Sequence, residues 1–301
     1  MIRAMSAAQP NVFTIYPKLL RVEQWLKNGF LFLPLVFSQN LGHVDFCMRA
    51  VLAFWSFSFM SSAIYIINDI HDRAEDQFHP EKKTRPMASG QVKPATAAVL
   101  SFLLLCFSLF LAGILPALFY APLLGYLLMQ VLYTFWVKTM VILDALFIAL
   151  GFLLRVIAGA VCIQVPISSW LLLCTFFLAL FLAFCKRRHE MSLEEALTHR
   201  PVLEQYSEKF LDQLISTTGA VTILCYALYA VSPETVQKFH TPLLVLTLPF
   251  VVYGVYRYMY LTLIKNRGGN PGRVFFHDLP FALNFGAWGI AAFVIVYWDR
   301  L

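Results

Sequence analysis

The chain has 301 residues, of which 59% are hydrophobic and 13% are charged, and its mean hydropathy is +0.69. Soluble globular domains carry about 25% charged residues, and no soluble fold of this length could bury so much apolar side-chain surface in its own core. The composition therefore excludes a soluble protein. It predicts an all-α integral membrane protein, because the apolar runs are continuous rather than alternating as in a membrane barrel.

The apolar runs follow one another along the whole chain, and they predict a single polytopic membrane domain, residues 1–301, built as a bundle of about nine transmembrane helices. A membrane-spanning helix needs roughly 20 mainly apolar residues. Before the first run, residues 1–27 include a short amphipathic segment whose Trp25 is typical of the membrane interface. The predicted spans lie near residues 28–45, 48–69, 95–117, 119–136, 141–163, 169–185, 210–231, 241–264 and 280–298.

Positive charge is distributed unevenly between the two sides of this predicted bundle. Of the 23 Lys and Arg residues, 18 fall on the side of the N-terminus and three on the opposite side. The positive-inside rule therefore predicts a multi-pass protein of the cell inner (plasma) membrane, with the N-terminus and the loops of about 70–94, 186–209 and 265–279 in the cytoplasm. The same placement accounts for the formal net charge of +6, so we expect no nucleic-acid partner.

An acidic motif at the cytoplasmic end of the second predicted span is the strongest functional signal. On a helix, Asn68, Asp69, Asp72 and Asp76 fall within about 100° of one another. Like charges so close repel unless a cation lies among them, and carboxylate and amide oxygens are ligands that suit Mg²⁺. The alternative is a solvated acidic helix end. The basic stretch Lys82-Lys83-Thr84-Arg85-Pro86 favours the metal, because a Mg²⁺–diphosphate site needs cations beside its carboxylates.

A second group of polar residues lies in and before the fifth predicted span: Tyr133, Lys138, Asp144, Gly151, Arg155 and Gly159. Asp144 and Arg155 share one stripe of the helix, about 16 Å apart along its axis, and cannot pair directly. An ionisable residue deep in a span indicates function, so we expect Arg155 to face a polar cavity. An interhelical salt bridge is the alternative. Asp144 lies nearer the cytoplasmic rim, on the wall opposite the acidic motif, where it is placed to complete the metal site.

Two further basic segments are less specific. Lys186-Arg187-Arg188 ends the sixth predicted span and suits either a positive-inside anchor or a substrate ligand. Gln24, Lys27 and Asn28 lie in the interfacial segment before the first span.

The spacing Asn68-Asp69-x-x-Asp72-x-x-x-Asp76 in a protein of about nine spans resembles the first motif of the UbiA prenyltransferase superfamily, which binds Mg²⁺ and a diphosphate. Finer matches over about residues 18–280 resemble one branch, the decaprenyl-phosphate phosphoribosyltransferases. The chain departs from the second superfamily motif, often D-x-x-x-D, because Asp144 is followed by Ile148. The matching stretches are residues 24–28, 79–80, 85–86 and 89–90, Lys138 with Asp144, and residues 151–155, 186–190, 257–258, 269–271 and Asp278.

This resemblance implies a UbiA-like fold and a Mg²⁺-dependent transfer of 5-phosphoribose from phosphoribosyl diphosphate to a polyprenyl (decaprenyl-type) phosphate, with release of diphosphate. It implies Asn68, Asp72 and Asp76 as metal ligands, and Asp72, Asp76 and Asp144 as catalytic residues. The implied substrate-binding residues are Gln24, Lys27, Asn28, Lys83, Arg85, Tyr133, Lys138, Arg155, Lys186 and Arg187.

Two other functions remain as alternatives. A UbiA-type aromatic prenyltransferase, which takes a polyprenyl diphosphate, would use the same metal motif but prefers a second pair of aspartates. A transporter would line a path with Asp144 and Arg155, but such a path needs polar residues in the outer halves of the spans, where the sequence has almost none. The lipid chain length and the oligomeric state, including a homo-oligomer, stay open.

Overall fold

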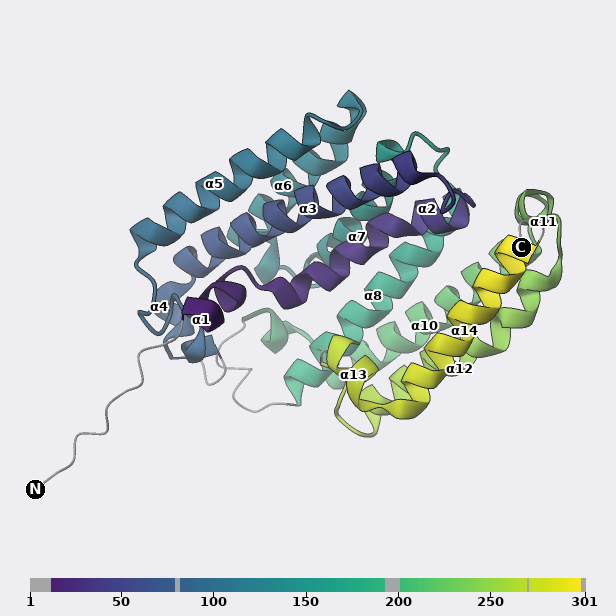
Figure 1. Cartoon of the computed structure of the whole chain (residues 1–301). Coiled ribbons are helices and arrows are strands. Elements are labelled where there is room, and N and C mark those ends of the chain that lie inside the picture. Colours follow the sequence, from purple (N-terminus) through teal and green to yellow (C-terminus); the bar gives the residue numbers. More distant parts are fainter. Residues whose placement is uncertain (1–11, 79–81, 193–200, 270, 299–301) are drawn as a thin grey trace, which may run out of the picture.

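A computed structural model describes residues 12–78, 82–192, 201–269 and 271–298, and their regular structure is helical. Within these ranges eight helices are long and apolar enough to cross a membrane. They confirm the predicted all-α membrane bundle (Figure 1). The eight are α3 (Val44–His71), α5 (Pro94–Ala112), α6 (Tyr120–Phe135) with the preceding η3 (Ala117–Phe119), α7 (Leu143–Cys162), α8 (Ser169–Met191), α10 (Glu208–Val231), α12 (Leu248–Leu263) with the preceding η6 (Leu243–Thr247), and α14 (Leu279–Tyr297).

The helices pack in an order that places α3 beside α5, α7 between α6 and α8, and α10, α12 and α14 on the far side of α8 (Figure 1). Small polar side chains join α3 to α5. Ser108 Oγ donates to the carbonyl oxygen of Ser56 at 2.8 Å, and Ser56 Oγ donates to that of Ser108 at 3.0 Å. Such residues let membrane helices approach closely and bond across the contact.

The first predicted span differs from the structure in its bounds and in its helix type. A 3-10 helix, η1 (Val22–Phe32), is followed by a short α-helix, α2 (Leu33–Phe37), and turns lead from there into α3. The predicted continuous helix over 28–45 is therefore wrong. At about 2.0 Å rise per residue in η1 and 1.5 Å in α2, the two elements together extend about 30 Å, the thickness of a bilayer core. They stand in the place of the first predicted span.

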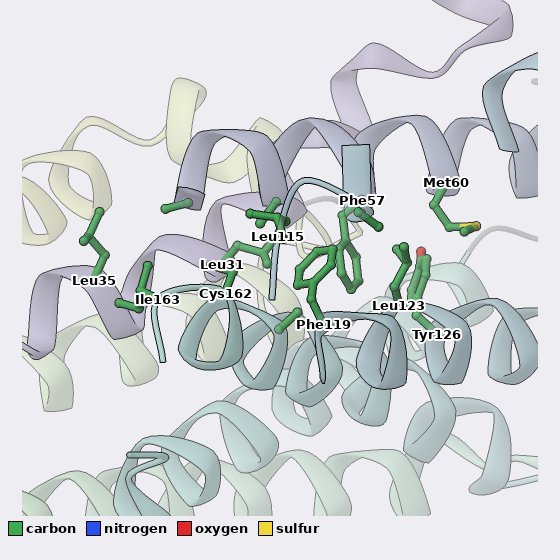
Figure 2. Close-up of a cluster of buried hydrophobic side chains, with 14 of the residues drawn as sticks. Leu31, Leu35, Phe57, Met60, Leu115, Phe119, Leu123, Tyr126, Cys162 and Ile163 are labelled. Carbon is green, nitrogen blue, oxygen red and sulfur yellow. The ribbon is translucent and has the colours of Figure 1, made fainter. Parts of the chain in front are cut away.

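Close packing fixes the position of η1 against α7. A Cβ added at Gly159 would lie 2.1 Å from the carbonyl oxygen of Leu31, so only glycine allows this approach. Leu31 belongs to the main cluster of buried apolar side chains, together with Phe57 of α3, Phe119 and Tyr126 (Figure 2). The polar residues that η1 carries are therefore held on a rigid element.

Four connections gather at one end of the bundle, which we call the loop end: residues 72–78 with 82–93, 136–142, 201–207 and 264–269. Lys138 contacts Asp72 there, and Tyr206 contacts Asp144. α8 continues to Met191, past the predicted boundary at 185, because its last charged turn is stabilised by the pair between Arg187 and Glu190. The short helices are α1 (Val12–Leu19), α4 (Arg73–Asp76), η2 (Lys82–Thr84), η4 (Val137–Thr139), η5 (Pro201–Gln205) and α13 (Pro271–His277) at or near this end, and α11 (Pro233–Phe239) between α10 and α12.

Some predicted features lie partly outside the described residues. These are residues 1–11 of the amphipathic segment, residues 79–81 of the loop over 70–94 with the matching stretch at 79–80, residues 193–200 of the loop over 186–209, and residue 270 of the loop over 265–279 and of the matching stretch at 269–271.

Candidate active site

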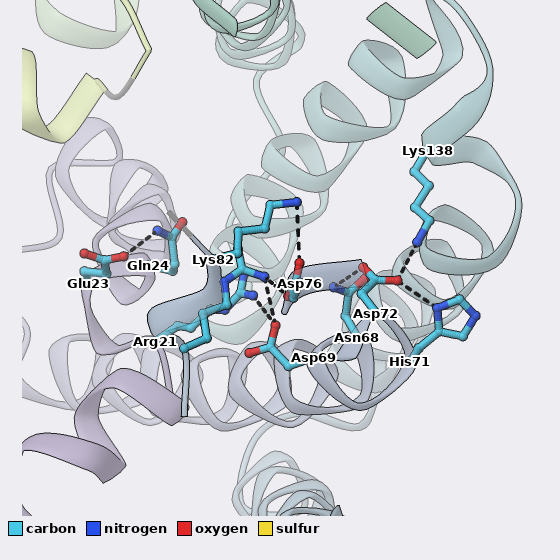
Figure 3. A network of polar contacts seen from close by, with 11 residues as sticks. Arg21, Glu23, Gln24, Asn68, Asp69, His71, Asp72, Asp76, Lys82 and Lys138 are labelled. Carbon is cyan, nitrogen blue, oxygen red and sulfur yellow. Dashed lines mark hydrogen bonds and ion pairs between the residues drawn. The ribbon is translucent and has the colours of Figure 1, made fainter. Parts of the chain in front are cut away.

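The acidic motif lies where α3 ends, at the loop end (Figure 3). The chain kinks at Asp72, whose ψ of 6° interrupts the helix: α3 ends at His71, and α4 continues to Asp76. Two backbone bonds keep the helical spacing across this kink: Asp72 N–H donates to the Asn68 carbonyl at 2.8 Å, and Asp76 N–H donates to the Asp72 carbonyl at 2.9 Å. The predicted acidic face therefore forms, but it is divided into two parts.

The first part joins two buried carboxylates, Asp69 and Asp76, through Arg85. Arg85 Nη1 donates to Asp76 Oδ2 at 2.6 Å and to Asp69 Oδ1 at 3.3 Å. Arg21, from the turn before η1, also pairs with Asp69, and Lys82 Nζ lies 3.6 Å from Asp76 Oδ1 (Figure 3). Buried carboxylates need such partners, because an unpaired buried charge is costly.

The second part is Asp72 with Asn68. Asn68 Nδ2 donates to Asp72 Oδ2 at 3.0 Å, and Lys138 Nζ donates to Asp72 Oδ1 at 2.7 Å. His71 Nδ1 lies 2.8 Å from the same oxygen. Burial alone would raise the pKa of Asp72, but the hydrogen bonds from Lys138 and His71 outweigh burial, and the pKa lies below its ordinary value. Asp72 is therefore ionised at neutral pH.

The donor atoms of the motif fit Mg²⁺ by their chemistry. Asn68, Asp72 and Asp76 offer carboxylate and amide oxygens, which hard cations prefer. Within the described ranges, no three His, Cys, Asp or Glu side chains converge closely enough to hold a metal, and each carboxylate of the motif has a Lys or Arg partner instead. Binding a metal with a diphosphate would exchange partners, so that carboxylates hold the metal and cations hold the diphosphate.

Asp144, Tyr133 and Arg187 come together in a separate buried cluster. Arg187 Nε donates to Asp144 Oδ2 at 2.6 Å, and Nη1 of the same guanidinium donates to Glu190 Oε2 at 2.8 Å. Arg187 Nη2 lies 3.5 Å from the Tyr133 hydroxyl. The side chains of Asp144 and Arg187 are only 0% and 1% exposed. Asp144 is thus paired with Arg187. That Asp144 completes the metal site from the wall opposite the acidic motif stays a prediction.

A strained turn presents Asp144 to this cluster. Ile142 has φ 68° and ψ −47°, and Leu143 N–H bonds the Val141 carbonyl at 2.7 Å. This is a γ-turn with its central residue at positive φ, which a β-branched residue rarely adopts. The Tyr206 hydroxyl accepts a bond from the Ile142 N–H at 2.7 Å and donates to Asp144 Oδ1 at 2.9 Å. One phenol therefore holds both the turn and the carboxylate, and strain of this kind is concentrated at functional sites.

Arg155 lies inside the bundle and is 4% exposed. Its bonding partners are neutral: Nε donates to Asn28 Oδ1 at 2.7 Å, Nη2 to the Tyr126 hydroxyl at 2.9 Å, and Nη1 to the Gly151 carbonyl at 2.8 Å. No carboxylate among the described residues pairs with it, so the interhelical salt bridge considered as an alternative does not form with this part of the chain. Arg155 brings a positive charge into the bundle interior.

Three other predicted substrate ligands lie in different settings. Gln24 of η1 bonds the exposed Glu23 at 3.4 Å. Lys83 of η2 is exposed. Lys186 Nζ lies 3.7 Å from Glu190 Oε1, one turn further along α8. The structure does not bring these three side chains into one cluster with the acidic motif.

The sequence model of the UbiA prenyltransferase family matches residues 30–279. The chain belongs to this family. It is similar to the decaprenyl-phosphate phosphoribosyltransferase of Mycolicibacterium smegmatis, with 33% identity over 230 residues, which cover 74% of this chain and 72% of that relative. It is also similar to the enzyme of the same name from Mycobacterium tuberculosis strain CDC 1551, with 32% identity over 219 residues, 71% of this chain and 72% of that relative.

Solved structures of the UbiA family share the fold. A UbiA homolog from Archaeoglobus fulgidus, bound to DMAPP and Mg²⁺, matches with a TM-score of 0.72 and 18% sequence identity, over 94% of this chain and 99% of that chain. The protein is thus a membrane-bound transferase of the UbiA superfamily, similar to the decaprenyl-phosphate phosphoribosyltransferases.

In this UbiA family member, residues that were not predicted as site residues also contact the predicted site. Arg21 pairs with Asp69, and others are Tyr126, Glu190 and Tyr206. Glu190 follows Arg187 by one helical turn, so a search for i, i+3 pairs would have found it. Tyr206 lies in a loop without periodicity, and no local pattern signals its bond to α7.

Proposed function

We propose that this protein transfers 5-phosphoribose from phosphoribosyl diphosphate to a polyprenyl phosphate of the decaprenyl type, and releases diphosphate. Support comes from the names of its relatives, at 32–33% identity over more than 70% of each chain. Further support comes from the fit of the acidic motif and its cations to a diphosphate with Mg²⁺.

The observation that carries the proposal is the buried guanidinium of Arg155 in the bundle interior. Arg155 is bonded there to Asn28 and Tyr126, without a carboxylate partner in the described part of the chain. A buried cation with neutral partners favours a substrate that brings negative charge. A phosphorylated sugar suits it, because it brings both negative charge and hydroxyl groups.

The reaction needs placement and charge neutralisation more than proton transfer. An oxygen of the lipid phosphate attacks the anomeric carbon of the ribose, and the bond from that carbon to the diphosphate oxygen breaks with its electrons going to the diphosphate. The nucleophile is already ionised, so no general base is required. Arg85 and Lys138, which pair with carboxylates of the motif, would hold the charge of the leaving group. Mg²⁺ held by Asn68, Asp72 and Asp76 would supply further neutralisation when bound.

The charge distribution supports a cytoplasmic loop end in the inner membrane, where a soluble phosphorylated donor is available. The lipid acceptor would reach the same site sideways from the bilayer.

The test uses the purified full chain with labelled phosphoribosyl diphosphate, Mg²⁺ and a polyprenyl phosphate. Label should move into the lipid phase only with Mg²⁺, and Asp72→Ala should abolish the transfer. Glu75→Ala, at an exposed acid of α4, is the matched control and should keep activity. In sealed vesicles, donor added outside should be consumed only when the vesicles are inside-out, because the loop end then faces the added donor. A folded protein without transfer would point instead to the aromatic prenyltransferase, assayed with a polyprenyl diphosphate and an aromatic acceptor.

A further inference from the structure

A cavity of about 240 Å³ lies at the end of the bundle opposite the loop end, away from the candidate active site. Figure 1 shows α2 and α11 toward this end and α1 and α4 at the other. The end of α2 lines the cavity with Phe37 and Ser38, the start of α8 with Trp170, and α11 with Glu234 and Lys238. The positive-inside rule predicts that this end faces outward, at the level of the lipid headgroups.

The two charged residues of the cavity wall, Glu234 and Lys238, lie one turn apart on α11 and do not pair with each other. A Glu four residues before a Lys on a helix is the favourable order for an ion pair. Here neither side chain has an ion-pair or hydrogen-bond partner among the residues that the structure describes. Lys238 is exposed as a residue, but its ammonium group is partly shielded from water, and this burial lowers its pKa below the ordinary value. The wall thus offers one positive and one negative charge to a ligand.

Lys238 is also unusual in its position along the chain. It is one of three cationic residues on this side of the bundle, with Arg49 and Arg300. A Lys here opposes the charge asymmetry that orients a membrane protein, so its presence favours a binding role. Arg49 Nη1 donates to Gln164 Oε1 at 3.3 Å, and Arg300 lies outside the described residues. Lys238 is therefore the described cation of this side that lacks a polar partner.

The size of the cavity suits a headgroup rather than a whole substrate. Pockets that enclose a small-molecule ligand measure about 300–1,000 Å³, and the volume here equals that of about eight water molecules at ~30 Å³ each. Part of the wall is apolar, with Pro34 and Phe37 of α2 and Val156 of α7. Such a wall fits the glycerol end of a lipid whose chains stay in the bilayer. Trp170 is a residue typical of this interface.

The start of α8 adds backbone donors to the wall. Leu172 N–H makes a bond to the Ser168 carbonyl at 3.1 Å, and Ser168 Oγ accepts from Leu171 N–H at 3.4 Å. The N–H groups of Ser169 and Trp170 precede these bonds, and both residues line the cavity. N–H groups in the first turn of a helix favour an anion. They add to Lys238 on the anion-binding side, whereas Glu234 suits a cation.

We infer that this cavity binds the headgroup of a zwitterionic phospholipid of the phosphoethanolamine type, with the phosphate oxygens at Lys238 and the ammonium group at Glu234. One ligand then satisfies both charges, whereas an anionic headgroup meets repulsion from Glu234. The inference is independent of the transfer reaction. Phe37 contacts Tyr229 of α10 beside the cavity, with ring centroids 6.3 Å apart. The bound lipid therefore holds α2, and with it η1, against α10 and α11.

Native mass spectrometry of the detergent-purified full chain tests this site, with phosphatidylethanolamine and phosphatidylglycerol of identical acyl chains as probes. The native protein should retain phosphatidylethanolamine about tenfold more tightly, the change expected for one charged hydrogen bond. Glu234→Gln should abolish this preference by weakening the zwitterionic lipid alone. Lys238→Met should weaken both lipids, because both carry the phosphate. Glu75→Gln and Lys93→Met remove the same charges from exposed residues of the loop end and should change neither affinity.

The midpoint of thermal unfolding in lipid-free detergent should be the same for all four variants and the native protein, so that a lost preference reports binding rather than folding. Equal retention of the two lipids by the native protein would overturn the site. Tighter binding of phosphatidylglycerol that Lys238→Met abolishes would show a simple anion site and overturn the zwitterionic headgroup. Soluble phosphoethanolamine is the probe without chains. If it raises the midpoint while the intact lipid is not retained, a free zwitterion is the ligand and the lipid is excluded.

Discussion

Tyr206 ties a strained backbone turn to a buried carboxylate through a single hydroxyl. Its ring stacks on Phe210, with centroids 6.3 Å apart, so Tyr206→Phe removes the bonds to Ile142 and Asp144 and keeps the packing. We expect turnover to fall about tenfold, because one of the lost bonds is to a charged group. Backbone hydrogen exchange at residues 141–143 should become faster, since the Ile142 N–H loses its acceptor.

Ile142→Gly supplies the matched background for this variant. Glycine adopts positive φ without steric cost, so the turn no longer needs the Tyr206 hydroxyl to hold it. Tyr206→Phe should then cost less activity in the Ile142→Gly protein than in the native one. Equal losses in both backgrounds would mean that the hydroxyl acts on Asp144 alone and that the strained turn has no part.

The pair between Asp72 and Lys138 predicts a pH dependence of stability. The pKa of folded Asp72 lies below its ordinary value of about 3.9, so its contribution is present above that value and is lost as the pH falls through the folded pKa. Lys138→Met removes a main cause of the lowered pKa. Thermal unfolding should be followed between pH 7 and pH 3. The midpoint temperatures of the variant and the native protein should differ most at neutral pH, and this difference should become smaller below about pH 4. The control Lys93→Met should show no such narrowing.

Among the elements, the contact of η1 with α7 depends on Gly159. A methyl group there would meet the carbonyl oxygen of Leu31 at 2.1 Å, and backbone cannot move aside as a flexible side chain can. Gly159→Ala should therefore lower stability by about 1–3 kcal/mol, as overpacking does, and lower activity by displacing Asn28. The midpoint of thermal unfolding measures the first effect. Gly286→Ala on α14, where a Cβ meets nothing within 4 Å, should leave that midpoint unchanged or slightly higher. A Gly159→Ala protein as stable as the native one would refute the close approach.

The sequence predicts most elements well, because continuous apolar runs and charged ends determine where membrane helices begin and end. It does not predict the 3-10 helix over residues 22–32. That conformation depends on partners far along the chain, such as Ser62, which accepts a bond from Trp25 at 2.9 Å, and Arg155, which binds Asn28. The kink at Asp72 escapes prediction for the same reason, since Lys138 reaches it from another loop.

In the whole molecule, the sequence indicates which residues gather at one end but not how they pair. The bond from Lys138 to Asp72 joins residues 66 positions apart, and that from Arg155 to Asn28 joins residues 127 apart. Asp144 illustrates the limit: its place near the cytoplasmic rim suggested a role in the metal site, but nothing in the sequence indicated that it pairs with Arg187. Such pairings depend on helix packing, which hydropathy does not encode.

The threefold turn of η1 also constrains how the gene segment for residues 22–32 can change length. Removing or adding three residues changes the length of η1 by one full turn, about 6 Å, and leaves each remaining side chain on the same face of the helix. A change of one or two residues turns Trp25 and Asn28 away from the serines of α3 that they bond. A change in length therefore keeps these side chains on their faces only in steps of three residues, which are nine nucleotides.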